Sequence, residues 1–426
     1  MQYLDMTKEA LKIELNKYNE EMNAIKEKGL KLDLSRGKPS KEQLDLSMPM
    51  LNVINSRSVM DSENGVDCRN YGGLDGIPEA KRLLADMMGT RSENVLVSDN
   101  SSLSLMFSLV SHGMIEGIMS ETPWFNVKNR KFLCPVPGYD RHFAITEHFG
   151  FELVSVPMNE DGPDMDVVES LVSNDDSIKG IWCVPMYSNP TGIVFSNETV
   201  KRFANLKPKA KDFRIFWDNA YCVHGLYPDD DVKFPDILEE CAKAGNPDMV
   251  YEFCSTSKVS FPGDGISAVA TSAANLIDIK NTLKFSTIGP DKINQLRHAR
   301  YFKNLAGIKA HMAKHADIMR PKFEKVLETL ECELGDTGVA SWTKPRGGYF
   351  ISFDTMNGCA SKVVSLCKDA GVVFTNAGAT HPYGVDPEDK NIRIAPSFAK
   401  NDEIEAAAKI LCLATKIVSL EKLLAE

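Results

Sequence analysis

Short runs of apolar, β-branched and aromatic residues recur along the middle of the chain, and stretches with helical spacing of apolar positions separate them. The clearest of these runs end at Val97, Cys134, Val156, Pro185, Trp217 and Cys254. Each run is short enough to be a buried strand. Strands that alternate with helices favour a mostly parallel sheet with helices on both faces. We therefore expect an α/β fold with a three-layer large domain.

The last third of the chain has a different pattern. An amphipathic stretch from about Lys292 to Leu334 predicts one long helical region. Strands and helices of a smaller α+β unit are then expected at 348–353, 361–370, 372–374, 391–395 and 402–424. A further amphipathic helix is expected near the N-terminus, over 6–28. We expect a large domain over 50–305 and a small domain built from 1–49 and 306–426.

Charge and cysteine usage narrow the possible partners and the compartment. The 426 residues carry a net charge of −10, which argues against nucleic acid or an anionic membrane as a partner. The ten cysteines include no C-x-x-C pair, as is typical of reduced thiols in a cytoplasmic protein. His311 and His315 have a spacing that metal ligands can have, but no H-E-x-x-H acid lies between them. We expect no metal site.

Three polar residues follow the ends of predicted strands: Asn189, Asp218 and Lys258. In a parallel α/β sheet, ligands bind beyond the carboxyl ends of the strands, so these side chains are expected to share one crevice. Burial lowers the pKa of a lysine, and a neutral amine is what Schiff-base chemistry requires. The alternative for Lys258 is a lysine whose stem is buried and whose ammonium reaches solvent.

Small hydroxyl side chains stand where an anion would need donors. Ser255 and Ser257 precede the lysine, and Asn100, Ser101 and Ser102 precede a predicted helix over 103–114. The free N–H groups and the dipole of a helix N-terminus favour a phosphate. The alternative for these residues is an ordinary helix N-cap.

Two further segments are candidates for binding a carboxylate. Arg393 alternates with apolar residues on a predicted strand, and an arginine fixed on a strand suits bidentate recognition of a carboxylate. A surface ion pair is the alternative. Arg36 and Gly37 lie in a predicted turn, where they are expected to lie near the substrate; a plain loop is the alternative.

Together these residue types meet the needs of one cofactor, pyridoxal phosphate. Lys258 is expected to bond to its aldehyde and Asp218 to pair with its pyridinium nitrogen. Asn189 and Tyr221 are expected to hydrogen-bond the ring hydroxyl, and Tyr139 to stack on the ring. The four serines are expected to bind the phosphate, and the arginine on the last strand to bind the α-carboxylate of an amino acid.

Over essentially its full length the chain resembles fold-type I pyridoxal-phosphate aminotransferases of class I/II, in the divergent aspartate aminotransferase-like branch. The resemblance rests on the stretches RGKPS, NYGGLDG, PGYDRHF, SNPTG, DNAY, STSK, SKVSFPG, PRGGYF and IRIAPSF. It implies that Lys258, Asp218 and Tyr221 are catalytic, with Lys258 also moving the proton. It implies that His142 supports the aspartate. It also implies a homodimer with shared active sites, in which Tyr71 reaches the phosphate of the neighbouring subunit's cofactor.

One departure from that family concerns the phosphate. Most members carry an arginine shortly after the lysine, whereas the segment Pro262–Ile266 contains none. The phosphate must then be neutralised by hydroxyls and amides, or by a more distant arginine such as Arg297 or Arg300.

The favoured function is an aminotransferase that moves an amino group from an L-amino acid to a 2-oxo acid by a ping-pong mechanism. Aspartate and 2-oxoglutarate are favoured from the branch resemblance. A side-chain carboxylate needs a second cation, and Arg36, Arg141 and Arg297 are candidates. One alternative is a lyase or decarboxylase with the same cofactor. Another is a non-catalytic regulatory module that binds the cofactor, against which the lack of a basic helix-turn-helix segment counts.

Overall fold

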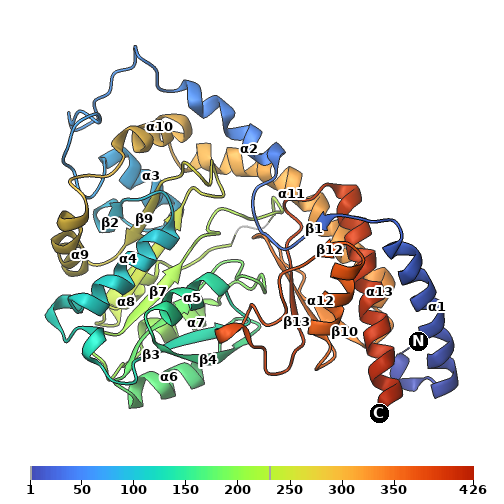
Figure 1. The fold of residues 1–426 in the computed structure, drawn as a ribbon. Helices are drawn as coiled ribbons and strands as arrows, with labels where there is room; N and C mark the ends of the chain where they lie inside the picture. The colour runs from blue at the N-terminus through green and yellow to red at the C-terminus, as the bar shows by residue number, and fades with distance from the viewer. Residues whose placement is uncertain (1, 230–231) are drawn as a thin grey trace.

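The computed structural model describes residues 2–229 and 232–426, and a large mixed sheet organises its bigger part (Figure 1). The strands are β2 (Val95–Val97), β3 (Lys131–Val136), β4 (Glu152–Asn159), β5 (Gly162–Pro163), β6 (Ile178–Cys183), β7 (Arg214–Asp218), β8 (Val250–Ser255) and β9 (Ser267–Ala270). Their order is β2-β9-β8-β7-β6-β3-β4-β5. The five strands from β8 to β4 are parallel, whereas β9 runs antiparallel to both of its neighbours. The expectation of a mostly parallel sheet is confirmed.

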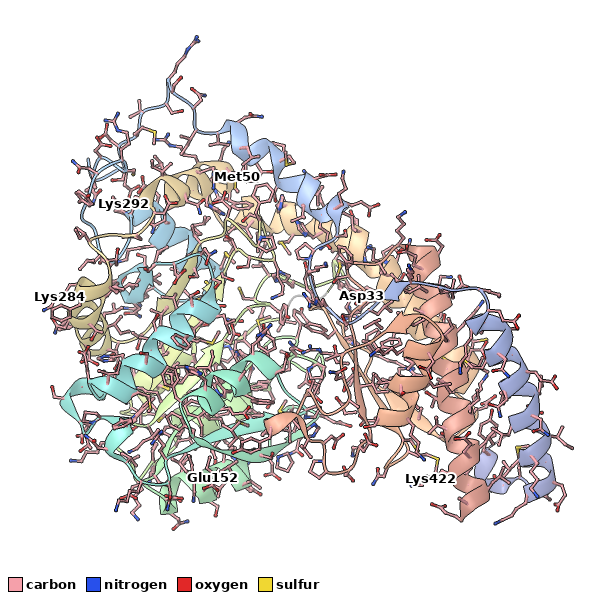
Figure 2. All side chains as sticks on the ribbon, in the orientation of Figure 1. Asp33, Met50, Glu152, Lys284, Lys292 and Lys422 are labelled. Carbon is pink, nitrogen blue, oxygen red and sulfur yellow. The ribbon has the colours of Figure 1, made fainter. Side chains whose placement is uncertain are left out.

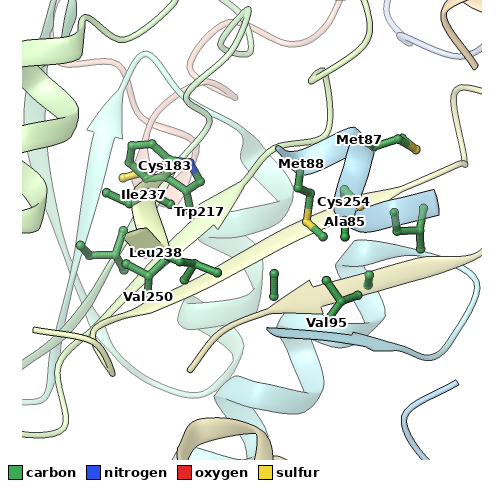
Figure 3. Packing of buried hydrophobic residues seen from close by; sticks show 14 of the residues in the cluster. Ala85, Met87, Met88, Val95, Cys183, Trp217, Ile237, Leu238, Val250 and Cys254 are labelled. Atoms are coloured by element: carbon green, nitrogen blue, oxygen red, sulfur yellow. The ribbon is translucent and has the colours of Figure 1, made fainter. Parts of the chain in front are cut away.

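Helices cover both faces of this sheet, as expected. One face packs on α3 (Pro78–Met88), α6 (Met165–Asn174), α7 (Asn197–Ala204), α8 (Ile237–Lys243) and α10 (Lys292–Phe302). The other packs on α4 (Ser102–Ile115), α5 (Asp140–His148) and α9 (Ala273–Ser286). Adjacent residues of one strand enter different cores: Phe216 faces α4, and Trp217 faces α8. Figure 3 shows Trp217 and Val250 against Ile237 and Leu238 of α8.

The smaller part contains two further sheets. An antiparallel sheet has the order β10 (Ala340–Trp342), β11 (Ile351–Thr355), β13 (Asn391–Ile394), and β1 (Leu32–Asp33) pairs in parallel with β12 (Val372–Val373). The helices of this part are α1 (Lys8–Lys26), α2 (Lys41–Ser47), α11 (Leu305–Leu334), α12 (Ala360–Asp369) and α13 (Asn401–Ala425). In Figure 1 the blue α1 lies beside the red α13. The β1–β12 pairing supports our proposed small domain of 1–49 and 306–426.

The single helical region expected from Lys292 to Leu334 is wrong in one respect, because the structure divides it into α10 and α11. Lys303 adopts a left-handed φ of 67°, which ends α10. Asn304 then caps α11 by accepting a hydrogen bond from the Gly307 N–H at 3.1 Å. A Cβ at Gly307 would lie 1.9 Å from the carbonyl oxygen of Phe302, so the break requires glycine there.

One helical stretch, Ser102–Ser120, is long and apolar enough to cross a membrane. More than half of it is buried in the fold, where α4 packs on the central sheet. The apolar composition of this stretch is accounted for by that core. Charged side chains such as Glu152 and Lys284 are exposed on the outside of the same part of the molecule (Figure 2).

Candidate active site

A cavity of about 250 Å³ lies beyond the carboxyl ends of β6, β7 and β8. The predicted site residues that line it are Ser101, Ser102, Tyr139, Asn189, Asp218, Tyr221, Ser255, Ser257 and Lys258. They come from five separate stretches of the sequence, which the parallel strands bring to one edge of the sheet.

Lys258 lies in the turn that follows β8, with its amine directed at aromatic rings. Its Nζ lies 5.1 Å from the centre of the Tyr221 ring and 5.9 Å from that of Tyr349. Burial lowers the pKa of Lys258 below its usual value, and the carboxylate of Asp218 opposes that shift. A larger share of the side chain is therefore neutral and nucleophilic than in a free lysine.

Asp218 is the last residue of β7, and one of its two carboxylate oxygens is held by a histidine. Oδ2 lies 2.9 Å from His142 Nε2, and both side chains are buried. The His142 ring is itself fixed by stacking on Trp182, with ring centres 4.6 Å apart. Within the described part of the chain, the buried Oδ1 of Asp218 has no hydrogen-bond partner. A buried oxygen that faces a cavity without a partner is suited to accept a hydrogen bond from a ligand N–H.

Tyr221 and Asn189 form the next part of the cavity wall. Tyr221 stacks on Tyr349 with ring centres 6.0 Å apart, and burial raises the pKa of its hydroxyl well above the usual value. The hydroxyl therefore stays protonated and able to donate. Asn189 accepts a hydrogen bond from Arg393 through Oδ1 at 3.3 Å, which leaves its amide N–H groups for a ligand. Tyr139 closes the cavity on the side of α5.

Serine hydroxyls surround the N-terminus of α4. Ser101 caps the helix by accepting from the Ser104 N–H, and Ser102 is the first helical residue. From the other side, Ser255 donates to Ser257 at 3.2 Å, and Ser257 donates to the carbonyl oxygen of Asn100 at 3.3 Å. These hydroxyls and the free helix N–H groups, at one end of the cavity, are donors suited to an anion.

The segment after Lys258, which lacks an arginine, packs its backbone closely against the serine-bearing loops. A Cβ at Gly265 would lie 2.9 Å from the Asn100 carbonyl oxygen and 3.3 Å from the Ser257 amide nitrogen. Ile266 is buried, and its N–H donates to Thr256. Arg297 does not reach the cavity, because it is paired with Asp264. Gly265 thus lets the two serine-bearing loops meet where a side chain would separate them.

Arg393 lies next to the cavity rather than in its wall. It is buried on β13, and its guanidinium carbon lies 4.9 Å from the centre of the Phe350 ring. Its Nη1 donates to Asp140 at 2.7 Å as well as to Asn189. The sequence-based alternative of a surface ion pair is wrong, because only 8% of the Arg393 side chain is exposed.

Several predicted residues do not line the cavity. Gly37 packs against the Phe350 ring, which a Cβ would approach to 2.3 Å, so it supports the arginine indirectly. Arg36 and Arg141 are exposed, and the structure does not select either as a second cation. Tyr71 is 79% exposed on the surface, and Asn100 contributes its carbonyl oxygen rather than its amide.

Sequence reasoning missed three polar residues behind Lys258. The ring nitrogen Nε2 of His224 lies 3.4 Å from the Lys258 carbonyl oxygen, and burial lowers the pKa of His224 to about 3. Gln43 of α2 donates to the hydroxyl of Tyr349 at 3.0 Å, and its Nε2 lies 3.2 Å from His315. His224 could have been found from the sequence, because it lies only three residues after the predicted site residue Tyr221. The contact from α2 has no local signal, because it joins residues 306 positions apart.

His311 and His315 belong to this buried polar network. Their Nε2 atoms lie 3.1 Å apart, and His311 Nε2 also lies 2.9 Å from the carbonyl oxygen of Val259. Burial lowers the pKa of both rings, so they are neutral at neutral pH. Their contacts connect α11 to the turn that carries the lysine.

A buried acid in β8 leads to a prediction on stability. Burial raises the pKa of Glu252 from its ordinary 4.5 to about 8, while Asn219 donates to it at 2.9 Å. Between these pH values the unfolded chain has lost the proton that the folded protein keeps. The free energy of unfolding therefore falls as pH rises, by up to about 1.4 kcal/mol per pH unit. Glu252→Gln should remove this loss, so its thermal midpoint should exceed that of the wild type increasingly from pH 5 to 8. Parallel midpoints across that range would contradict the assignment.

The residues present fit pyridoxal phosphate on the chemistry of the donors they offer. The partnerless Oδ1 of Asp218 suits the pyridinium N–H, the buried amine of Lys258 suits an aldehyde, and the serines at the N-terminus of α4 suit a phosphate.

Comparison with known proteins agrees with this geometry. The family model of aspartate amino-transferase matches residues 6–426. An aspartate aminotransferase from Corynebacterium glutamicum is 48% identical over 387 residues, which cover 90% of this chain and 88% of the relative.

Two solved structures of aminotransferases also match this chain. The crystal structure of an aspartate transaminase from Corynebacterium glutamicum superposes with a TM-score of 0.96 at 45% identity and covers 99% of both chains. An alpha-aminoadipate aminotransferase from Thermus thermophilus, solved with N-(5'-phosphopyridoxyl)-L-leucine, has a TM-score of 0.74 at 19% identity. It covers 93% of this chain and 94% of its own, and at that identity it supports the fold alone.

Proposed function

The chain belongs to the aspartate amino-transferase family, and on that premise we propose that it transfers the amino group of L-aspartate to 2-oxoglutarate with pyridoxal phosphate. It is an aminotransferase of fold type I, class I/II, and acts on amino and oxo acids. The choice of aspartate is supported by the 48% identical relative of that name. The choice of pyridoxal phosphate is supported above all by one observation: Lys258 and the unpartnered Oδ1 of Asp218 lie in the same cavity.

The cofactor, when bound, supplies an aldehyde that carries the amino group and a pyridinium ring that accepts electrons. The carboxylate of Asp218 would keep the ring nitrogen protonated. His142 would orient that carboxylate by holding its other oxygen. Asn189 and Tyr221 would orient the ring hydroxyl, and the serines around α4 would hold the phosphate. Tyr139 would cover one face of the ring.

Lys258 would also be the base that moves the proton from the substrate Cα. Its lowered pKa leaves a neutral amine able to accept that proton. Tyr221 and Tyr349 lie over the amine and keep bulk water from it. Arg393 would bind the α-carboxylate and so fix the Cα within reach.

A lyase or decarboxylase with the same cofactor is distinguished by its need for an acceptor. The purified protein is incubated with L-aspartate, with and without 2-oxoglutarate, and the products are quantified. We expect oxaloacetate and glutamate in equal amounts over many turnovers only when 2-oxoglutarate is present. Sustained release of alanine, pyruvate or ammonia without an acceptor would contradict transamination.

We propose a homodimer with shared active sites. Lys292 donates to the carbonyl oxygens of Asn70 and Gly72, each at 2.7 Å, and so holds the loop that carries the exposed Tyr71. Large apolar side chains are also exposed at the end of α9 and just after it, including Phe285 and Ile288. The reduced cysteines support a cytoplasmic location.

Tyr71→Phe tests the shared site. Loss of one hydrogen bond to a phosphate is expected to raise the Kd for pyridoxal phosphate by roughly tenfold. Sedimentation should show that the variant remains a dimer, because the substitution keeps the ring. An unchanged Kd in a dimeric variant would remove Tyr71 from the site, and a monomeric wild type would overturn the dimer.

A further inference from the structure

The guanidinium of Arg393 is already bound by a carboxylate of the protein itself. Nη1 donates to Asp140 Oδ1 at 2.7 Å and to Asn189 Oδ1 at 3.3 Å. Asp140 is the first residue of α5 and directly follows Tyr139, which lines the cavity. The side chain that would receive the substrate's α-carboxylate therefore already has an anionic ligand, which comes from the N-terminus of α5.

The two partners differ in how firmly they are held. Arg393 is fixed by the Phe350 ring and by Asn189, and 8% of its side chain is exposed. Asp140 has 35% of its side chain exposed, so it can turn into water without moving the backbone of α5. When a second carboxylate arrives, Asp140 is the group that can leave.

Electrostatics gives a reason for it to leave. One guanidinium carries a single positive charge, so two carboxylates on it would leave an excess negative charge at a largely buried site. A like charge nearby and a low dielectric both disfavour that arrangement. Substrate binding at Arg393 is therefore coupled to release of Asp140.

We propose that Asp140 is a displaceable internal ligand of Arg393 that competes with the carboxylate of the substrate and sets the affinity for it. This inference rests on the proposed function, in which Arg393 binds the α-carboxylate. Substrate and product carry the same α-carboxylate, so the competition weakens the binding of both. Ligand entry would also break an ion pair between α5, which packs on the large sheet, and β13, which belongs to the three-stranded sheet of the smaller part.

The test uses succinate, an unreactive dicarboxylate, titrated calorimetrically into the cofactor-loaded enzyme. In Asp140→Asn, loss of a charge-assisted hydrogen bond to the arginine should tighten succinate binding about tenfold. The KM for L-aspartate should fall in proportion while kcat does not fall, because uniform binding is gained. Asp140→Glu, which keeps the charge, should bind succinate as the wild type does.

Asp175→Asn is the matched control. Asp175 pairs with Lys131 at 2.9 Å and is 31% exposed, and it precedes β6 at the sheet edge opposite the cavity. Its pKa is lowered to about 2, mainly by the Ser177 hydroxyl, so the substitution removes a full charge at neutral pH. Succinate affinity should stay within twofold of the wild type. Tightening equal to that of Asp140→Asn would show a general charge effect and overturn the proposal.

Arg393→Gln separates this proposal from the function on which it rests. Weaker succinate binding in Arg393→Gln, with unchanged or weaker binding in Asp140→Asn, would overturn the role of Asp140 alone. Unchanged binding in Arg393→Gln would overturn both the carboxylate assignment and the competition. Circular dichroism and thermal midpoints establish that each variant is folded.

Discussion

Lys258→Ala is expected to abolish transamination, with kcat falling by roughly 10⁴-fold or more. The variant loses both the nucleophilic amine and the base that removes the Cα proton. The fold should persist, because the Nζ of Lys258 lies more than 5 Å from the centres of the Tyr221 and Tyr349 rings and makes no hydrogen bond within the described part of the chain.

The control for that variant is Lys131→Ala, which removes a lysine from the opposite edge of the sheet. Lys131 pairs with Asp175, and 27% of its side chain is exposed. Its loss should leave kcat unchanged. Steady-state rates with L-aspartate and 2-oxoglutarate measure both variants. More than about a tenth of wild-type activity in Lys258→Ala is incompatible with the proposed mechanism.

Asp218→Asn is expected to lower kcat by roughly 10²–10³-fold, the loss typical of removing one group that stabilises charge in the transition state. An amide has no negative charge to keep the ring nitrogen protonated. Asp218→Glu keeps the charge on a longer stem and should retain more activity than the amide.

His142→Gln separates charge from orientation at the same place. It leaves the Asp218 carboxyl group in place but removes the ring that stacks on Trp182 and holds Oδ2. We expect kcat to fall by about 10- to 100-fold, as is typical for a supporting group, which is less than in Asp218→Asn. Rates of the three variants, measured at equal cofactor saturation, give the order. A greater loss in His142→Gln than in Asp218→Asn would contradict the assigned roles.

The strands and the core of the site were predictable because both depend on local patterns. Buried strands are short apolar runs, and polar residues directly after parallel strands must meet at one edge. That rule alone places Asn189, Asp218 and Lys258 together. The break between α10 and α11 was not predictable, because the helical pattern continues through Lys303 and the left-handed turn depends on tertiary context.

Contacts between distant segments also escaped the sequence. Arg393 and Asp140 are 253 residues apart, and Gln43 and Tyr349 are 306 apart. No spacing rule connects such pairs, and each residue alone looks like an ordinary surface group. The serine-rich end of the cavity shows the same limit: the sequence left hydroxyls and amides or a distant arginine as alternatives for the phosphate, and it did not indicate that Gly265 permits a close approach of two loops.

The decisive measurement is the visible absorbance of the purified protein loaded with pyridoxal phosphate. We expect a band that bleaches on addition of L-aspartate and returns on addition of 2-oxoglutarate, and that is missing from Lys258→Ala. A wild-type spectrum that no amino acid changes, or a Lys258→Ala spectrum identical to that of the wild type, would contradict the proposed function.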